Sequence, residues 1–217
     1  MSEVTRGPAA ALRDLRDIAT STADPLARET RFVFGEGNPN ARLMLVGEAP
    51  GGDEDRLGRP FVGAAGRMLD RALAVAGIER SALWVSNVVK RRPTAPGRGR
   101  ALKNRPPTTA EIAADRRWID AEIAAIHPAV LVCLGAVAAN ALIHPRFRLG
   151  TERGQLRQAP FGGLALATYH PSYLLRFHGA DFERAFGAVV ADLAHAASAA
   201  RIGQHAVGDS ARDGIAD

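Results

Sequence analysis

Three polar side chains with the capacity for chemistry each follow, or close, a short apolar run: Glu48, Asn87 and His170. A carboxylate can hold water and stabilise positive charge, and a carboxamide offers one acceptor and two donors. A neutral imidazole donates a hydrogen bond through one ring nitrogen. Because sites gather at the carboxyl ends of parallel strands, the sequence predicts one crevice that holds all three groups.

Four apolar runs that are rich in Val, Leu and Ile predict the strands that would carry these groups. They are Arg42–Gly47, Leu83–Val88, Ala129–Gly135 and Leu164–Tyr169. Helical spacing predicts helices at Arg67–Ala76, Thr109–Ile126, Ala136–Ile143 and Phe182–Ala196. Thr108 or Thr109 can cap the second of these helices, and Glu111 can complete a capping box. The alternation predicts a single-domain α/β/α sandwich around a central, four-stranded, mostly parallel sheet.

Two segments lack periodicity and are expected to be irregular. Residues 91–107 contain four prolines and six basic residues without an acid. Residues 198–217 are small and polar, so the sequence predicts a folded domain over 1–197 and a disordered tail.

Composition sets broad limits on the class of protein. The net charge is +5, from 28 Lys and Arg against 23 Asp and Glu, which is compatible with a polyanionic partner. The one cysteine, Cys133, lies in an apolar run and is expected to be a small core residue in a reducing cytoplasm. The first residues contain no long apolar stretch, so neither a signal peptide nor a membrane span is expected.

Three segments, in order, resemble motifs of the bacterial and archaeal uracil-DNA glycosylases that carry an iron–sulfur cluster. They are FGEGNPNARLMLVGEAPGGDEDRLGRPFVGAAGRMLDRAL, WVSNVVKRRP and ATYHPSYLLR. The resemblance extends from about Pro25 to Ala194. It implies the uracil-DNA glycosylase fold and a monofunctional hydrolase that removes uracil flipped out of DNA, the first step of base excision repair.

The sequence departs from that family at the cluster. The family holds the cluster with four cysteines, whereas the matching positions here are Ser21, Asp24, Arg91 and Asp115. Such clusters need thiolate ligands, so we expect no cofactor and no metal in this chain. The chain resembles an iron–sulfur-free relative, with the bacterial type of broad base specificity as a candidate. In place of the cluster we expect Arg91 to pair with Asp24, Asp115 or both.

The resemblance implies roles for the crevice residues. Glu48 becomes the catalytic carboxylate, and His170 becomes the catalytic donor to uracil O2. Asn87 pairs with uracil N3–H and O4, for which cytosine presents the opposite pattern. The expected base-binding set is Asn87, Phe61, Gly47, Ala49 and Gly51, with Phe61 stacking on the base. Gly51 falls where the strictest uracil glycosylases have a blocking Tyr, so the resemblance predicts a wider pocket that also takes ethenocytosine, hypoxanthine or xanthine.

The resemblance also implies contacts with DNA, the expected partner of a monomeric protein that does not bind membranes. Leu174 resembles the wedge that fills the hole left by the flipped nucleotide, and Leu175 or Arg176 can share that role. Ser172 and the backbone amide of Gly63 are expected to contact phosphates. Lys90 and the basic residues of the 91–107 segment, including Arg98 and Arg100, are expected to contact the DNA backbone.

Other interpretations are open at this point. A relative that stays covalently attached to uracil-DNA uses a histidine in the loop after the second strand, but residues 88–126 contain none. A non-catalytic nucleic-acid binder or a nucleotide-binding α/β protein does not predict the three crevice groups. Individually, Glu48 can cap a turn, Asn87 can form one, and Phe61 can be an ordinary core residue.

Overall fold

The computed structural model describes residues 7–21, 30–97 and 102–209, with side chains to residue 201. The sheet strands are β1 (Glu36–Gly37), β2 (Leu43–Gly47), β3 (Trp84–Asn87), β6 (Val130–Leu134), β7 (Arg157–Gln158) and β8 (Leu164–Thr168). The helices are α1 (Pro8–Ser21), α2 (Gly52–Leu57), α3 (Ala64–Val75), α4 (Thr109–Ile126), α5 (Ala136–Leu142), α6 (Leu149–Glu152), α7 (Pro171–Leu174) and α8 (Gly179–Asp209). A 3₁₀ turn, η2 (Arg80–Ala82), precedes β3.

The sheet has the order β1-β3-β2-β6-β8-β7. Its four central strands, β3, β2, β6 and β8, run parallel, as predicted. The short strands β1 and β7 pair antiparallel at the two edges. The predicted α/β sandwich is therefore confirmed, and the two-residue edge strands extend its predicted four-stranded sheet.

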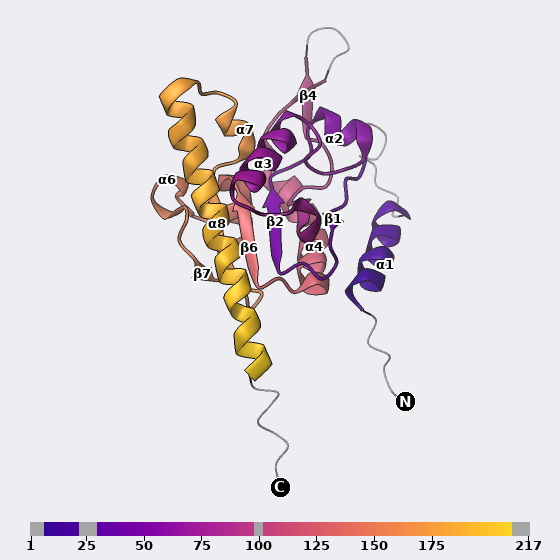
Figure 1. Ribbon diagram of the computed structural model, residues 1–217. Helices are drawn as coiled ribbons and strands as arrows, with labels where there is room; N and C mark the ends of the chain where they lie inside the picture. Colours follow the sequence, from indigo (N-terminus) through magenta and orange to yellow (C-terminus); the bar gives the residue numbers. More distant parts are fainter. Residues whose placement is uncertain (1–6, 22–29, 98–101, 210–217) are drawn as a thin grey trace, which may run out of the picture.

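Helices cover both faces of the sheet (Figure 1). Alternate residues of β2 face opposite sides: Met44 and Val46 pack with α4 and α5, while Leu43 and Leu45 pack with α3 and α8. The central strands are therefore apolar along almost their whole length. Helix α4 begins as predicted, because the Thr108 side chain accepts from the Glu111 amide in a capping box.

The structure differs from the sequence prediction in the two segments expected to be irregular. Strands β4 (Thr94–Pro96) and β5 (Leu102–Asn104) pair antiparallel, so the basic segment forms a hairpin, which projects beyond the sheet (Figure 1). Helix α8 continues past Ser198 to Asp209, and Ala200 is buried against the sandwich. The Arg42 guanidinium donates to the Ala200 carbonyl at 2.8 Å, which fixes that turn. The rest of the predicted tail, 210–217, lies outside the described residues.

Within the described residues, none of the helices has the length and apolar character that a membrane crossing needs.

Candidate active site

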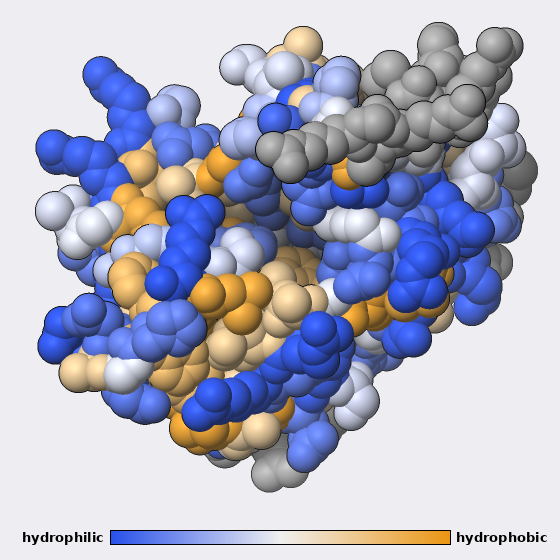
Figure 2. Space-filling model, turned by 90° about the horizontal axis from the view of Figure 1, so that it is seen from above, coloured by the Kyte–Doolittle hydropathy of each residue, from blue (hydrophilic) through white to orange (hydrophobic). Residues whose placement is uncertain are grey.

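The carboxyl ends of β2, β3 and β8 meet at one cavity of about 520 Å³. Seen from above in Figure 2, this end of the molecule has a recess near its middle. The lining residues come from five places: the turn after β2, the stretch from α2 to the start of α3, the end of β3, the β4–β5 hairpin with the residues beside it, and α7 with its flanking residues. They are Glu48, Ala49, Pro50, Gly51, Glu54, Phe61, Ala65, Asn87, Pro93, Asn104, Arg105, Pro106, His170, Ser172, Tyr173 and Arg176. The predicted crevice thus contains Glu48, Asn87 and His170 together.

Two glycines allow the site residues to approach one another. A Cβ on Gly47 would lie 2.5 Å from both Asn87 Oδ1 and Phe61 Cζ. Gly135, which follows β6, has a φ of 95°, and a Cβ there would lie 3.0 Å from the Cβ of His170. Gly47 therefore leaves room for the Asn87 and Phe61 side chains, and Gly135 leaves room for His170.

His170 caps the short helix α7 through one ring nitrogen. The Ser172 amide donates to His170 Nδ1 at 3.2 Å, and Ser172 Oγ lies 2.7 Å from the same nitrogen. An Nδ1 that accepts hydrogen bonds leaves the proton on Nε2. Burial lowers the pKa of His170 to about 4, although the nearby Glu54 opposes this shift. His170 is therefore a neutral donor at physiological pH.

Glu48 begins the turn after β2 and lines the same cavity. Its backbone carbonyl accepts from the Val89 amide at 3.0 Å, which joins this turn to the segment after β3. Burial raises the pKa of the Glu48 carboxyl, because desolvation disfavours the charged form. A positive charge that comes close to this carboxylate would therefore stabilise its ionised form.

Asn87 is 2% exposed, and its Oδ1 is buried without a hydrogen-bond partner. An unpaired buried acceptor costs free energy, so native proteins seldom keep one without a reason. The backbone of Asn87 is held from behind, because Lys90 Nζ donates to its carbonyl oxygen at 2.8 Å. Asn87 therefore presents a fixed, open acceptor to whatever enters the cavity.

Phe61 has a φ of 53°, which non-glycine residues seldom adopt. Its ring is 5% exposed and lies 5.9 Å from the His170 ring at an interplanar angle of 35°. A backbone outlier of this kind costs about 1–3 kcal/mol and persists only where the surroundings impose it. The ring is thus held as one wall of the cavity.

Glu54 is a site residue whose position the sequence reasoning did not predict. It is buried, and its carboxylate accepts from the amides of Gly51, Val62 and Gly63 at 3.1, 3.0 and 2.8 Å. The predicted phosphate contact of the Gly63 amide is therefore wrong, because that amide is already occupied. A glutamate three residues after the Gly51 cap is the sequence signal for this clamp.

Helix α7 corrects the predicted wedge. Leu174 is fully buried in the core beneath α7, so it cannot enter DNA without unfolding. Leu175 is 44% exposed and Tyr173 is 38% exposed on the outer side of the same turn. Successive residues of a helical turn point about 100° apart, so Leu175 lies at the surface where Leu174 does not. Leu175, an alternative already inferred from the sequence, is therefore our candidate for the wedge. Arg176 lines the cavity beside it.

The basic residues at and after the end of β3 differ in how far the structure describes them and in whether they are already paired. Arg98 and Arg100 lie outside the described residues, so their contact with DNA stays a prediction. Lys90, expected among the DNA-binding residues, is instead fully buried and paired with Glu122 at 2.7 Å. Arg105 is held by two bonds to Glu111 at 2.7 and 2.6 Å, which lower the pKa of that carboxyl to about 2.

The former cluster positions do not fit an iron–sulfur centre. The sequence has a single cysteine, and burial within β6 raises the pKa of the Cys133 thiol well above its usual range. Asp115 accepts from the Lys90 amide at 2.6 Å, and Arg91 donates to the Thr30 carbonyl at 2.6 Å. The guanidinium of Arg91 also lies over the Phe32 ring. Asp24 lies outside the described residues, and the expected pairing of Arg91 stays a prediction.

Comparison with known proteins identifies the family of this chain. Residues 34–194 match the model of the uracil DNA glycosylase superfamily. The chain is 40% identical over 165 residues to the type-4 uracil-DNA glycosylase of Thermotoga maritima, covering 75% of this chain and 82% of that protein. It is 38% identical over 151 residues to the type-4 enzyme of Pyrobaculum aerophilum, covering 66% and 73%. It is 35% identical over 161 residues to the type-5 uracil-DNA glycosylase of Thermus thermophilus, covering 65% and 69%.

Proposed function

Because this chain belongs to the uracil DNA glycosylase superfamily, we propose that it is a monofunctional glycosylase that hydrolyses the bond between uracil and deoxyribose in DNA. The type-4 names of its relatives at 36–40% identity support uracil as the base. The reaction removes the damaged base and starts base excision repair. The substrate nucleotide must leave the duplex to reach the cavity.

The open acceptor of Asn87 is the observation that carries this proposal. Asn87 Oδ1 is buried at the cavity without a partner. The N3–H of uracil is a donor that pairs with this oxygen, and uracil O4 accepts from the carboxamide nitrogen. Cytosine presents an acceptor at N3 and a donor at its exocyclic amine, so it would leave the Asn87 oxygen unsatisfied. A mismatch of this kind discriminates strongly between substrates.

His170 serves the leaving group. Negative charge collects on the departing uracil, and the Nε2–H of a neutral imidazole donates to its O2 oxygen. The hydrogen bonds from Ser172 at Nδ1 keep this tautomer and orient the ring. No proton needs to be transferred, since the uracil anion is stabilised by the hydrogen bond itself.

Glu48 serves the sugar. Bond cleavage gives C1′ oxocarbenium character, which a nearby carboxylate stabilises electrostatically. The same carboxylate can orient the water that adds to C1′. Phe61 stacks on the extruded base and holds it against these groups.

A gel assay tests the proposal. A labelled duplex with one uracil is incubated with the protein and then heated in alkali, which breaks the strand at an abasic site. We expect strand cleavage with uracil and none with the same duplex containing cytosine or thymine. A shifted, heat-stable adduct would point to covalent capture instead, and an unchanged strand would reject the proposal.

A further inference from the structure

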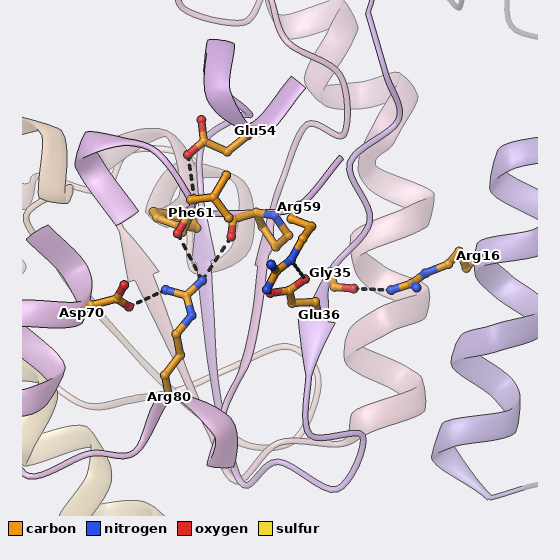
Figure 3. A network of polar contacts seen from close by, with 10 residues as sticks. Arg16, Gly35, Glu36, Glu54, Arg59, Phe61, Asp70 and Arg80 are labelled. Carbon is orange, nitrogen blue, oxygen red and sulfur yellow. Dashed lines mark hydrogen bonds and ion pairs between the residues drawn. The ribbon is translucent and has the colours of Figure 1, made fainter. Parts of the chain in front are cut away.

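Arg80 lies outside the cavity and donates hydrogen bonds to the backbone at Phe61, the residue proposed to stack on the base. Its Nη2 lies 3.1 Å from the Pro60 carbonyl oxygen and 3.2 Å from the Phe61 carbonyl oxygen, and it donates to both. Its Nη1 donates to Asp70 on α3 at 2.6 Å. Figure 3 shows the guanidinium between Asp70 and the two carbonyls. Arg80 belongs to η2, just before β3, and is not among the cavity-lining residues.

The Phe61 conformation depends on contacts of this kind. With a φ of 53°, the residue is in the left-handed region, so its neighbours must impose the conformation. Glu54 holds the two amides that follow, those of Val62 and Gly63. Gly66 makes room on the other side, because a Cβ there would lie 2.0 Å from the Phe61 carbonyl oxygen. Arg80 supplies the hydrogen bonds at the carbonyl itself.

We propose that Arg80 is a positioning residue that fixes the Phe61 ring as the stacking wall for the flipped base. The proposal deepens the function proposed above and rests on it. Arg80 acts on the site through the Pro60–Phe61 backbone, since its guanidinium donates to both carbonyls and does not line the cavity. Asp70 forms an ion pair with Arg80 and thereby orients the guanidinium toward the two carbonyls.

The same loop offers a matched control in Arg59. Arg59 stands two residues before Phe61 and forms two hydrogen bonds of 2.8 Å with Glu36 (Figure 3). Both arginines therefore tie the loop through an ion pair, but only Arg80 reaches the Phe61 carbonyl. A general loss of loop stability would affect the Arg59 variant as well.

The test is a double-mutant cycle on single-turnover uracil release. We expect Arg80→Ala to slow release about tenfold, because small displacements in a site have large effects on rate. Asp70→Asn and Arg80→Lys should fall in between, and Arg59→Ala should stay close to wild type. In a Phe61→Leu background, Arg80→Ala should cause little further loss, since the ring through which it acts is already gone.

Two kinetic results would each overturn the proposal: an unchanged rate in Arg80→Ala, or a full additional tenfold loss in the Phe61→Leu background. If Arg80→Ala does not fold, Asp70→Asn replaces it in the same double-mutant cycle with Phe61→Leu. Crystal structures add a readout that is independent of activity. We expect a displaced Phe61 ring in Arg80→Ala, and a ring in its original place would also reject the proposal. A wild-type protein without uracil release would contradict the proposed function, whereas wild-type activity with an unaffected Arg80→Ala variant would contradict this inference alone.

Discussion

The ammonium of Lys90 donates to the backbone carbonyl of Asn87 at 2.8 Å, in a place where both residues are buried. The same ammonium bonds Ser86 Oγ at 2.7 Å and Glu122 Oε1 at 2.7 Å, and Glu122 also accepts from the Trp84 indole. A charged pair in the core thus lies directly behind Asn87, the residue that we propose recognises the base. It links α4 to the carboxyl end of β3.

We expect Lys90→Met to lower the free energy of unfolding by about 3–5 kcal/mol, because it leaves the Glu122 carboxylate buried and unpaired. The double variant Lys90→Met with Glu122→Gln should recover part of this loss. Chemical denaturation measures both. Arg184→Met, which breaks an exposed pair with Asp181, is the control and should change stability little. Equal effects of Lys90→Met and Arg184→Met would contradict this account of the buried pair.

The rate of uracil release should depend on the ionisation of Glu48 and not on that of His170 near neutrality. The raised pKa of Glu48 means that release increases with pH as this carboxyl ionises, above the range of an ordinary glutamate. With a pKa of about 4, His170 is already neutral there, so no second step is expected near pH 6.5.

Single-turnover rates across the acid range measure this dependence. Glu48→Gln should flatten the acid limb and slow release on the order of 100-fold, with little change in DNA affinity. His170→Ala should slow release by a similar factor and keep the acid limb. Near wild-type rates in both variants would show that the active site lies elsewhere.

Alanine substitution of the neighbouring Leu174 and Leu175 should affect different properties, stability for Leu174 and uracil release for Leu175. Leu175→Ala should slow uracil release from duplex DNA about tenfold, because an exposed apolar side chain is available to replace the flipped base, and should leave stability unchanged. Release from single strands should change less, since no stack needs filling. Leu174→Ala should instead cost about 2–5 kcal/mol of stability through a core cavity. A Leu175→Ala variant with full duplex activity would remove it as the wedge.

The substrate range should be wider than uracil alone. Gly51 carries no side chain. A Cβ there would lie 2.8 Å from Glu54 Oε2 and 3.6 Å from Nδ2 of Asn104, which approaches this gap from the hairpin. We expect release of ethenocytosine, hypoxanthine or xanthine from a panel of oligonucleotides. Asn104→Gly should increase release of these larger bases relative to uracil. Activity confined to uracil, in the wild type and in Asn104→Gly, would disprove a widened pocket.

The basic hairpin should contribute to the salt dependence of DNA binding. Each phosphate contact adds about 0.9 to the slope of log affinity against log salt for duplex DNA. We expect Arg98→Glu with Arg100→Glu to reduce this slope by roughly two contacts. The double variant Arg13→Glu with Arg201→Glu makes the same charge change on exposed positions of α1 and α8 and should leave the slope nearly unchanged. Identical slopes in the two double variants would exclude the hairpin from the interface.

The sequence predicted the four central strands because each is a short, mostly apolar run with turn-rich flanks, which favours a buried strand over a helix. It predicted the meeting of Glu48, Asn87 and His170 because parallel strands end at the same edge. It did not predict β1 and β7, since two-residue strands have no periodicity. Leu174 and Leu175 are chemically identical in the sequence, so only the packing of α7 distinguishes the buried one from the exposed one.

The partners of charged residues were also beyond the sequence. Lys90 was grouped with the basic segment that follows it, although its ammonium is buried beside Glu122, 32 residues away. Glu54 is one of three consecutive acids in the first turn of α2, and its three amide donors come from two separate turns. Long-range pairing of this kind depends on the tertiary arrangement, which a local pattern does not contain.

The Glu54 clamp has a consequence for turnover. By accepting from Gly51 on one turn and from Val62 and Gly63 on another, it makes the floor and the stacking wall of the cavity move as one body. Such a cavity is shaped before any nucleotide arrives, so its complementarity extends to the free base that remains after cleavage. We therefore expect the pocket to retain the released base, so that steady-state turnover follows the departure of this base rather than the breaking of its bond.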